Sequence, residues 1–341
     1  MAATSCLASS SLARSAARSL GSTVACLRAY SSTPPSGPFA PGYPPRARLT
    51  SSGLGWMLVS ASRPPLVVEG KTYQPDAFTN VTPQILSKLP LALHLDPSHP
   101  IGIIRSLIES HFSTFTPVRP PSAVVSVRQN FDELGFPPEH PARVKGDSYY
   151  LDRETVLRTH TSAHELEAFR SGLEQYLISG DVYRRDEVDR SHYPVFHQME
   201  GASVWSPADI SKLPALNDAL REKIARSASP LLVTDPTEPL AVENPAQPEH
   251  DAETLRLITD NLKLSLNSLI LTLFRTHTDQ AGEPLQVRWI NATFPWTAPS
   301  YEVEVFWGGE WLEILGCGVV KQDLLKRSGA SFYDPELRAE L

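Results

Sequence analysis

Residues 180–201, GDVYRRDEVDRSHYPVFHQMEG, decide the fold of this chain. Residues 181–184 and 194–200 alternate polar and apolar side chains on either side of a charged loop, which predicts two strands. Paired antiparallel, they bring Arg184 into the neighbourhood of Gln198 and Glu200, and those two project from one face because they are two residues apart. A guanidinium suits phosphate oxygens, whereas a carboxylate with an amide suits an ammonium group. The stretch predicts a site where an amino acid meets a nucleotide; a hairpin with a solvated loop is the alternative.

Composition limits the class of protein. The chain has 341 residues, of which 41% are hydrophobic and 20% charged, as in soluble globular proteins large enough for two domains. No apolar run approaches the length of a membrane span. Cys317 is the one cysteine outside the first thirty residues, which excludes a disulfide framework and a zinc cluster. A net charge of −7 argues against nonspecific nucleic-acid binding.

The N-terminal part differs from the rest. Its first acidic residue is Glu69, and residues 1–30 combine arginines with many Ser and Ala. This composition is typical of a mitochondrial transit peptide, which predicts a protein of the mitochondrial matrix; a merely disordered terminus is the alternative. We expect residues 31–75 to be a flexible Pro/Ser-rich spacer and residues 76–341 to form the folded domain.

A second hairpin is expected in residues 301–316, YEVEVFWGGEWLEILG, where Gly308 and Gly309 form a two-residue turn. The turn predicts three cross-strand pairs: Trp307 with Glu310, Phe306 with Trp311, and Glu304 with Glu313. Two carboxylates that face each other repel, and Glu302 shares their face. A cation should compensate, either a magnesium ion or a basic side chain; a solvent-facing edge is the alternative.

Helical spacing of apolar residues predicts helices over residues 101–112 and from Asp251 to about residue 273. A strand is expected at residues 124–127. A further helix is expected to begin near residue 164, with Thr161 or Ser162 as its N-cap.

Residues 180–201 resemble, without a gap, motif 2 of class II aminoacyl-tRNA synthetases in its phenylalanine-specific version. Four further stretches resemble the single-chain mitochondrial kind of that family, namely residues 99–101, 130–143, 157–164 and 294–318. The resemblance implies an α+β fold, with a mostly antiparallel sheet flanked by helices. It also implies the family's reaction, in which ATP activates phenylalanine and the acyl group passes to mitochondrial tRNA.

The resemblance also implies roles for individual residues. Arg184 would be the catalytic residue, holding the α-phosphate and the amino-acid carboxylate. Gln198 and Glu200 would bind the substrate ammonium, and His160 and Ser162 the carboxylate and the neighbouring phosphate.

Other implied roles concern ATP, the phenyl ring and the metal. Asp186 and His192 would contact ATP, although Asp186 stands where the family usually has Glu. Phe294 and Trp296 would pack on the phenyl ring, with Trp296 departing from the family's Phe, and Gly316 would let the backbone approach the ligand. Magnesium would be held by Glu302, Glu304 and Glu313.

The pattern breaks after residue 325, where the family continues into a glycine-rich strand, a helix with an essential arginine (motif 3) and an anticodon-binding domain. Here the chain continues as KRSGASFYDPELRAEL. We expect a monomer whose central sheet lacks one strand, with weak ATP binding and little aminoacylation. A noncatalytic synthetase-like fragment is the alternative. The α-subunit of the heterotetrameric bacterial type is disfavoured by the transit-like start and by the absence of a coiled-coil arm.

Overall fold

The computed structural model describes residues 2–9, 63–185, 193–227, 230–238, 241–281 and 284–329. The strands are β1 (Ala2–Ser9), β2 (Leu66–Val68), β3 (Lys71–Tyr73), β4 (Thr116–Val118), β5 (Val124–Ser126), β6 (Tyr150–Asp152), β7 (Thr155–Leu157), β8 (Gln175–Tyr183), β9 (Val195–Trp205), β10 (Leu231–Thr234), β11 (Leu285–Phe294), β12 (Thr297–Trp307) and β13 (Glu310–Val320). The α-helices are α2 (Pro83–Leu86), α3 (Pro100–His111), α4 (Glu165–Arg170), α5 (Pro207–Ile210), α6 (Leu213–Ala225), α7 (Ala252–Ala281) and α8 (Gln322–Ser328). Short helical turns are η2 (Leu89–Leu91), η3 (Leu93–Leu95), η4 (Arg128–Asp132), η5 (Pro141–Arg143) and η6 (Thr161–His164).

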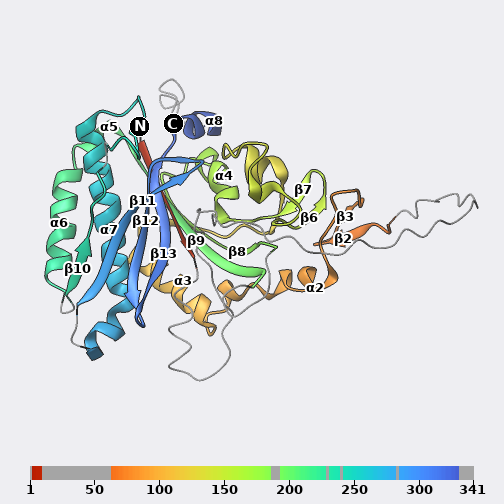
Figure 1. The fold of residues 1–341 in the computed structure, drawn as a ribbon, viewed down its shortest axis with the longest axis horizontal. Coiled ribbons are helices and arrows are strands. Elements are labelled where there is room, and N and C mark those ends of the chain that lie inside the picture. Colours follow the sequence, from red (N-terminus) through yellow and green to blue (C-terminus); the bar gives the residue numbers. More distant parts are fainter. Residues whose placement is uncertain are drawn as a thin grey trace, which may run out of the picture.

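An eight-stranded sheet in the order β10-β11-β12-β13-β1-β9-β8-β4 forms the centre of the molecule (Figure 1). Its neighbours pair antiparallel except at the two ends, where β10 runs parallel to β11 and β4 parallel to β8. The predicted α+β architecture, a mostly antiparallel sheet flanked by helices, is confirmed.

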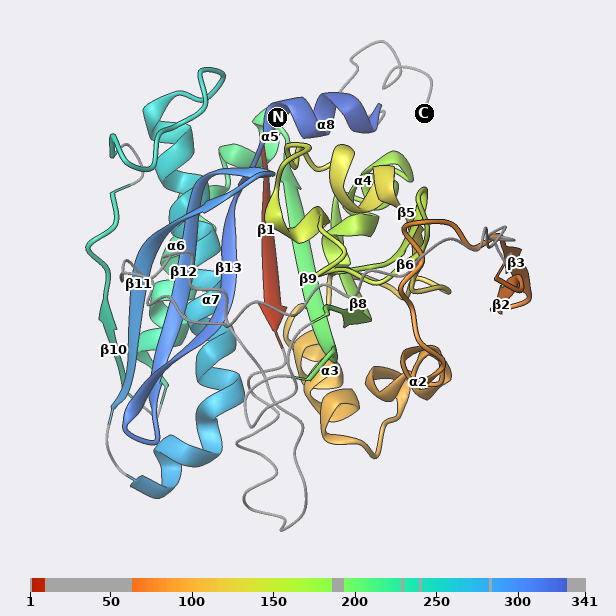
Figure 2. The same cartoon turned by 45° about the vertical axis from the view of Figure 1, so that its right-hand side comes forward.

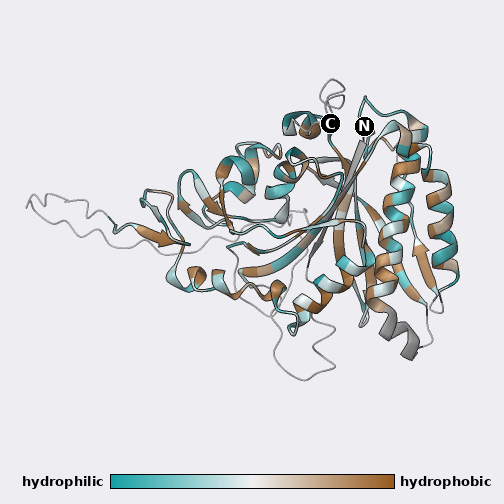
Figure 3. Ribbon diagram, turned by 180° about the vertical axis from the view of Figure 1, so that it is seen from behind, coloured by the Kyte–Doolittle hydropathy of each residue, from teal (hydrophilic) through white to brown (hydrophobic). Residues whose placement is uncertain are grey.

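The two faces of the sheet are covered by different elements. On one face, Ile108 of α3 and Leu266 of α7 pack against Leu177 and Met199 of β8 and β9. Figure 3 views the molecule from behind and shows hydrophilic and hydrophobic stretches interspersed on the helices there, as expected when one side of a helix faces a core. The opposite face is covered by η4, α4 and α8, and this is the face that carries the candidate site.

Both predicted hairpins are confirmed. In the first, β8 pairs with β9 so that Gln198 lies opposite Gly180 and Glu200 opposite Ile178. In the second, all three predicted pairs across the β12–β13 turn form, and Gly308 and Gly309 have φ values of 61° and 90°, which favour glycine. The long helix predicted from Asp251 is α7, and the expected helix and strand at residues 101–112 and 124–127 are α3 and β5.

The structure describes two strand-forming stretches in the N-terminal part of the chain. Within the expected spacer, β2 and β3 form a hairpin whose Val68 is buried with Leu151 and Tyr183, so the folded region begins earlier than residue 76. Residues 2–9, expected to be part of a transit peptide apart from the fold, form β1 between β9 and β13 (Figure 2).

No helix in the described part of the chain is both long and apolar enough to cross a membrane.

Candidate active site

The centre of the site is the pair Gln198 and Glu200 on β9, whose side chains are 5% and 1% exposed. The hydroxyl of Ser162 donates a hydrogen bond to Oε2 of Glu200 at 2.5 Å, and Thr161 Oγ1 donates to the same oxygen at 3.3 Å. Neither hydroxyl acts as the expected N-cap of a helix. The Ser162 hydroxyl therefore orients Glu200, and its expected contact with the substrate carboxylate stays a prediction.

Two buried acceptors in this pair have no partner among the described residues, Oε1 of Gln198 and Oε1 of Glu200. A buried oxygen without a hydrogen bond costs free energy, so such atoms call for an explanation. Burial raises the pKa of Glu200 to about 7, opposed by the Ser162 and Thr161 hydrogen bonds. A cationic donor such as an ammonium group would satisfy both acceptors and favour the ionised carboxylate.

Arg184 extends from the end of β8, where its backbone N–H donates to the carbonyl of Pro194 at 3.0 Å. Strand alternation continued from Gly180 places it on the same face as Gln198 and Glu200. Its Nε donates to the Thr159 carbonyl at 2.9 Å, and its guanidinium lies 5.0 Å from the centre of the Phe196 ring. The register thus places Arg184 on the same face as Gln198 and Glu200; that the three residues form one binding site stays a prediction.

An aromatic wall lies beside this face. The rings of Phe136 and His160 are 5.6 Å apart and nearly parallel, His160 stacks on Trp296 at 5.7 Å, and Trp296 stacks on Phe294 at 5.8 Å. Burial, with the nearby charge of Arg184, lowers the pKa of His160 to about 3, so its imidazole is neutral at physiological pH. The sequence did not predict that the His160 ring would stack between Phe136 and Trp296.

Gly316, which was expected to let the backbone approach the ligand, lies against the ring of Phe294. A Cβ at this position would lie 2.4 Å from Cζ of Phe294, so the glycine gives room to the Phe294 ring. The close approach that requires glycine here is to the aromatic wall.

We expect Gly316→Ala to displace the Phe294 ring and to lower the free energy of unfolding by about 1–3 kcal/mol, measured by urea denaturation. Gly146→Ala is the matched control, because its Cβ would lie 3.6 Å from the nearest atom, an ordinary contact. Equal stability of the two variants would contradict the prediction.

The acidic hairpin differs from the predicted magnesium site. Glu304 forms an ion pair with Arg288, so the cation beside this carboxylate is a basic side chain. Burial, then Glu302 and Glu304, raise the pKa of Glu313 to about 8. The part of the chain that the structure describes contains no group of three His, Cys, Asp or Glu side chains arranged to hold a metal. Magnesium binding by Glu302, Glu304 and Glu313 stays a prediction.

The two halves of the site are electrostatically connected. The charge of Arg184 adds to the effect of burial in lowering the pKa of His160, and it partly opposes the rise in the pKa of Glu313. Asp186 and His192, expected to contact ATP, lie outside the described residues.

The sequence did not predict the buried hydrogen bonds of Arg158 and Asn130, which hold the segment next to the site. Arg158 is buried, with Nη2 donating to Oδ1 of Asp181 at 2.7 Å and Nε to the Asp181 carbonyl at 2.6 Å. Its neighbour Thr159 is held through two hydrogen bonds by Asn130. This network fixes residues 158–162. That segment carries the Thr159 carbonyl, which accepts from Arg184, and the hydroxyls of Thr161 and Ser162, which donate to Glu200. The glycine at position 180 was the available signal, since a Cβ there would lie 2.5 Å from the guanidinium of Arg158.

The family profile described as "tRNA synthetases class II core domain (F)" matches residues 93–229 and 250–335, more than half of the chain. The chain belongs to this family.

Several relatives of this class II synthetase core carry the name phenylalanine–tRNA ligase. The mitochondrial protein of Saccharomyces cerevisiae is 42% identical, covering 83% of this chain and 67% of its own length. The mitochondrial protein of Rattus norvegicus is 39% identical over 76% of this chain and 53% of its own length. The chloroplastic/mitochondrial protein of Arabidopsis thaliana is 37% identical over 74% and 50%. The chain thus spans about half to two thirds of the length of these relatives.

Proposed function

We propose that this class II synthetase core acts as a phenylalanine–tRNA ligase, activating phenylalanine with ATP and transferring it to mitochondrial tRNA. The observation that carries the proposal is a pair of buried oxygens on Gln198 and Glu200 that have no hydrogen-bond partner in the described part of the chain. They lie on the same face as Arg184, as binding of an aminoacyl nucleotide requires. The names of the relatives supply the identity of the amino acid.

In this proposal the chain acts mainly by positioning and by electrostatics. Gln198 and Glu200 hold the ammonium group of phenylalanine, so that its carboxylate oxygen can attack the α-phosphorus while pyrophosphate leaves. Arg184 neutralises the negative charge that develops at the α-phosphate. The aromatic wall formed by Phe136, His160, Trp296 and Phe294 supports the phenyl ring. His160 would then face the ligand as a neutral ring.

Magnesium would be held by Glu302 and Glu313 together with phosphate oxygens of ATP. These residues suit a cation because they bring several carboxyl groups close together. Burial and the neighbouring carboxylates raise the pKa of both Glu302 and Glu313, and a bound cation would offset this crowding of negative charge. Mg²⁺ in nucleotide sites is typically bound by one or two carboxylates plus phosphates and supplies charge neutralisation there. Glu304 would support this pair indirectly, since it is neutralised by Arg288.

We propose that the protein is located in the mitochondrial matrix. The mitochondrial names of the relatives and the arginine-containing, acid-free composition of residues 1–30 support import into the mitochondrial matrix. We propose that the protein acts there as a monomer.

The direct test is phenylalanine-dependent exchange of pyrophosphate into ATP by the purified chain. We expect slow exchange, because ATP binding is expected to be weak. Exchange that needs phenylalanine and is not supported by leucine would support the proposal. A noncatalytic synthetase-like protein would show no exchange and no heat on titration with a nonhydrolysable phenylalanyl-adenylate analogue. That pair of results would refute the proposal.

The affinity for phenylalanine should depend on pH through Glu200. Its carboxyl has a pKa of about 7 in the free protein, so it is protonated below and ionised above that value. Because only the carboxylate attracts an ammonium ion, the Kd for phenylalanine should fall about tenfold between pH 6 and pH 8. Isothermal titration at several pH values measures this. A flat profile for the native chain, or the same slope in Glu200→Gln, would contradict the prediction.

A further inference from the structure

A loop between the two matched parts of the chain reaches the strands of the candidate site. The family profile covers residues 93–229 and 250–335, so it leaves out residues 230–249. Within that loop, Asn244 and Gln247 are buried, with 4% and 9% of their surface exposed. Buried amides need hydrogen-bond partners, and the partners of these two lie on β12, on β13 and at the start of α8.

Gln247 joins two backbone segments that are distant in sequence. Its Nε2 donates to the Ala298 carbonyl at 2.7 Å and to the Val320 carbonyl at 3.1 Å. Its Oε1 accepts from the backbone N–H of Gln322 at 2.8 Å. This N–H is the first of α8 and has no partner within the helix, and the side chain of Lys321 at the N-cap does not cap the helix. One amide therefore ties the beginning of β12 to the beginning of α8.

The register of the sheet explains why buried amides are needed here. The pairing of β12 with β13 shifts between Thr297 and Ser300, which interrupts the regular ladder of backbone hydrogen bonds. Asn244 supplies the missing partners at Ser300, because its Oδ1 accepts from the Ser300 N–H at 2.8 Å and its Nδ2 donates to the Ser300 carbonyl at 2.6 Å. Gln247 satisfies the carbonyl of Ala298 in the same way. The two amides thus fix the shape of the irregular segment.

The two segments that Gln247 joins also hold Trp296 of the aromatic wall. Trp296 lies two residues before Ala298, and its backbone carbonyl accepts from the Lys321 N–H at 2.9 Å. On α8, Leu324 belongs to the same buried cluster as the Trp296 ring. The backbone of Trp296 is therefore held on one side by the turn before β12 and on the other by the residues that begin α8.

We propose that Gln247 is a positioning residue for the amino-acid site and acts through Trp296. The inference rests on the proposed function, in which the aromatic wall supports the phenyl ring of the substrate. The Trp296 ring stacks on His160 at 5.7 Å and on Phe294 at 5.8 Å, so a shift of this ring disturbs its neighbours in the wall. A displacement of about 1 Å is enough to weaken a site of this kind.

The first test follows the ring itself by fluorine NMR of the full chain labelled with fluorotryptophan. The Trp296 resonance is assigned by its loss in Trp296→Phe. Gln247→Met keeps the length of the side chain and removes its polar atoms. In this variant we expect the Trp296 resonance to shift or broaden, because the backbone on both sides of it loses a hydrogen-bond partner.

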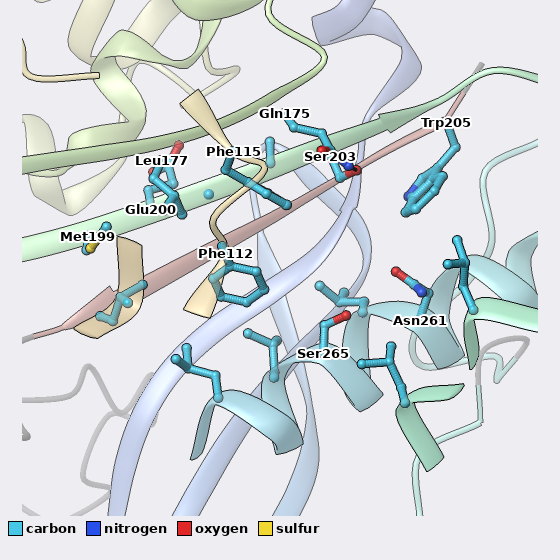
Figure 4. A pocket seen from close by; sticks show the side chains of 18 of the residues that line it. Phe112, Phe115, Gln175, Leu177, Met199, Glu200, Ser203, Trp205, Asn261 and Ser265 are labelled. Carbon is cyan, nitrogen blue, oxygen red and sulfur yellow. Dashed lines mark hydrogen bonds between the residues drawn. The ribbon is translucent and has the colours of Figure 1, made fainter. Parts of the chain in front are cut away.

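Asn217→Leu is the matched control, since it removes another buried amide. Asn217 is 1% exposed and links α6 to α7, donating to the Leu257 carbonyl at 3.0 Å and accepting from Asn261 at 2.9 Å. Asn261 lines a cavity of about 400 Å³ between the sheet and its helices (Figure 4), on the face opposite the aromatic wall. We expect the Trp296 resonance to stay where it is in this variant.

The second measurement is isothermal titration with phenylalanine and, separately, with ATP. Gln247→Met should raise the Kd for phenylalanine about five- to thirtyfold and leave the Kd for ATP within about twofold of the native value. Asn217→Leu should leave both within about twofold. A general loss of stability would not produce this difference between the two ligands.

An unchanged Trp296 resonance in Gln247→Met would overturn the proposal. A shifted resonance with an unchanged Kd for phenylalanine would overturn it too, as would equal effects of Asn217→Leu. A native chain that binds no phenylalanine would refute the proposed function together with this inference. An unaltered Gln247→Met variant beside a native chain that binds phenylalanine would refute this inference alone.

Discussion

Replacing Glu200 with glutamine is expected to lower kcat/KM for phenylalanine-dependent pyrophosphate exchange by about 30- to 700-fold at pH 8. The variant keeps the size of the side chain but loses the charge that attracts the substrate ammonium. Removing one partner of a buried, hydrogen-bonded charge pair costs about 2–4 kcal/mol, which corresponds to this range. Glu200 is 1% exposed, so solvent screens the interaction little.

The matched control is Glu167→Gln. Glu167 lies on the nearby α4, and its side chain is 73% exposed. We expect this variant to remain within about twofold of the native chain, since exposed charges contribute little. Equal losses in the two variants would show that general electrostatics, and not an ammonium contact at Glu200, governs the rate.

Arg158→Met is expected to lower the free energy of unfolding by about 3–5 kcal/mol, measured by urea denaturation. The change leaves the buried carboxylate of Asp181 without its cationic partner, with only the Tyr183 hydroxyl still donating to its other oxygen. Breaking a buried ion pair on one side costs this much. The side chains of Arg158 and Asp181 are 2% and 9% exposed. The Arg158 guanidinium donates one hydrogen bond to the carboxylate of Asp181 and one to its backbone carbonyl.

Two further variants make this prediction specific. Arg221→Met removes two ion pairs of similar length, to Asp218 and Asp260, but the Arg221 side chain is 50% exposed, so a loss below about 1 kcal/mol is expected. The double variant Arg158→Met with Asp181→Leu should recover part of the stability, because no buried charge then remains unpaired. A double variant less stable than Arg158→Met would contradict the explanation.

Local patterns in the sequence were sufficient for the hairpins. Alternation over residues 181–184 and 194–200 predicts β8 and β9, and the Gly308–Gly309 turn predicts the register of β12 against β13, including Glu304 opposite Glu313. These predictions succeed because the period of a strand and the geometry of a two-residue turn are properties of neighbouring residues.

The choice of partners inside the site was less predictable. The repulsion between Glu304 and Glu313 was foreseen, but the cation proved to be Arg288, which a third strand brings alongside. Ser162 was expected on the substrate and is found on Glu200. In each case the partner lies far away in sequence, and the contact exists only once the strands and turns are assembled.

The sequence by itself determined the strand alternation, the turn and the face shared by Gln198 and Glu200, since each depends on residues a few positions apart. Only the tertiary structure decided which buried oxygens lack a partner among the described residues, which ring stacks on His160, and that residues 2–9 lie between β9 and β13. The physical reason is that burial, desolvation and strand order arise from contacts between distant segments, which no local period encodes.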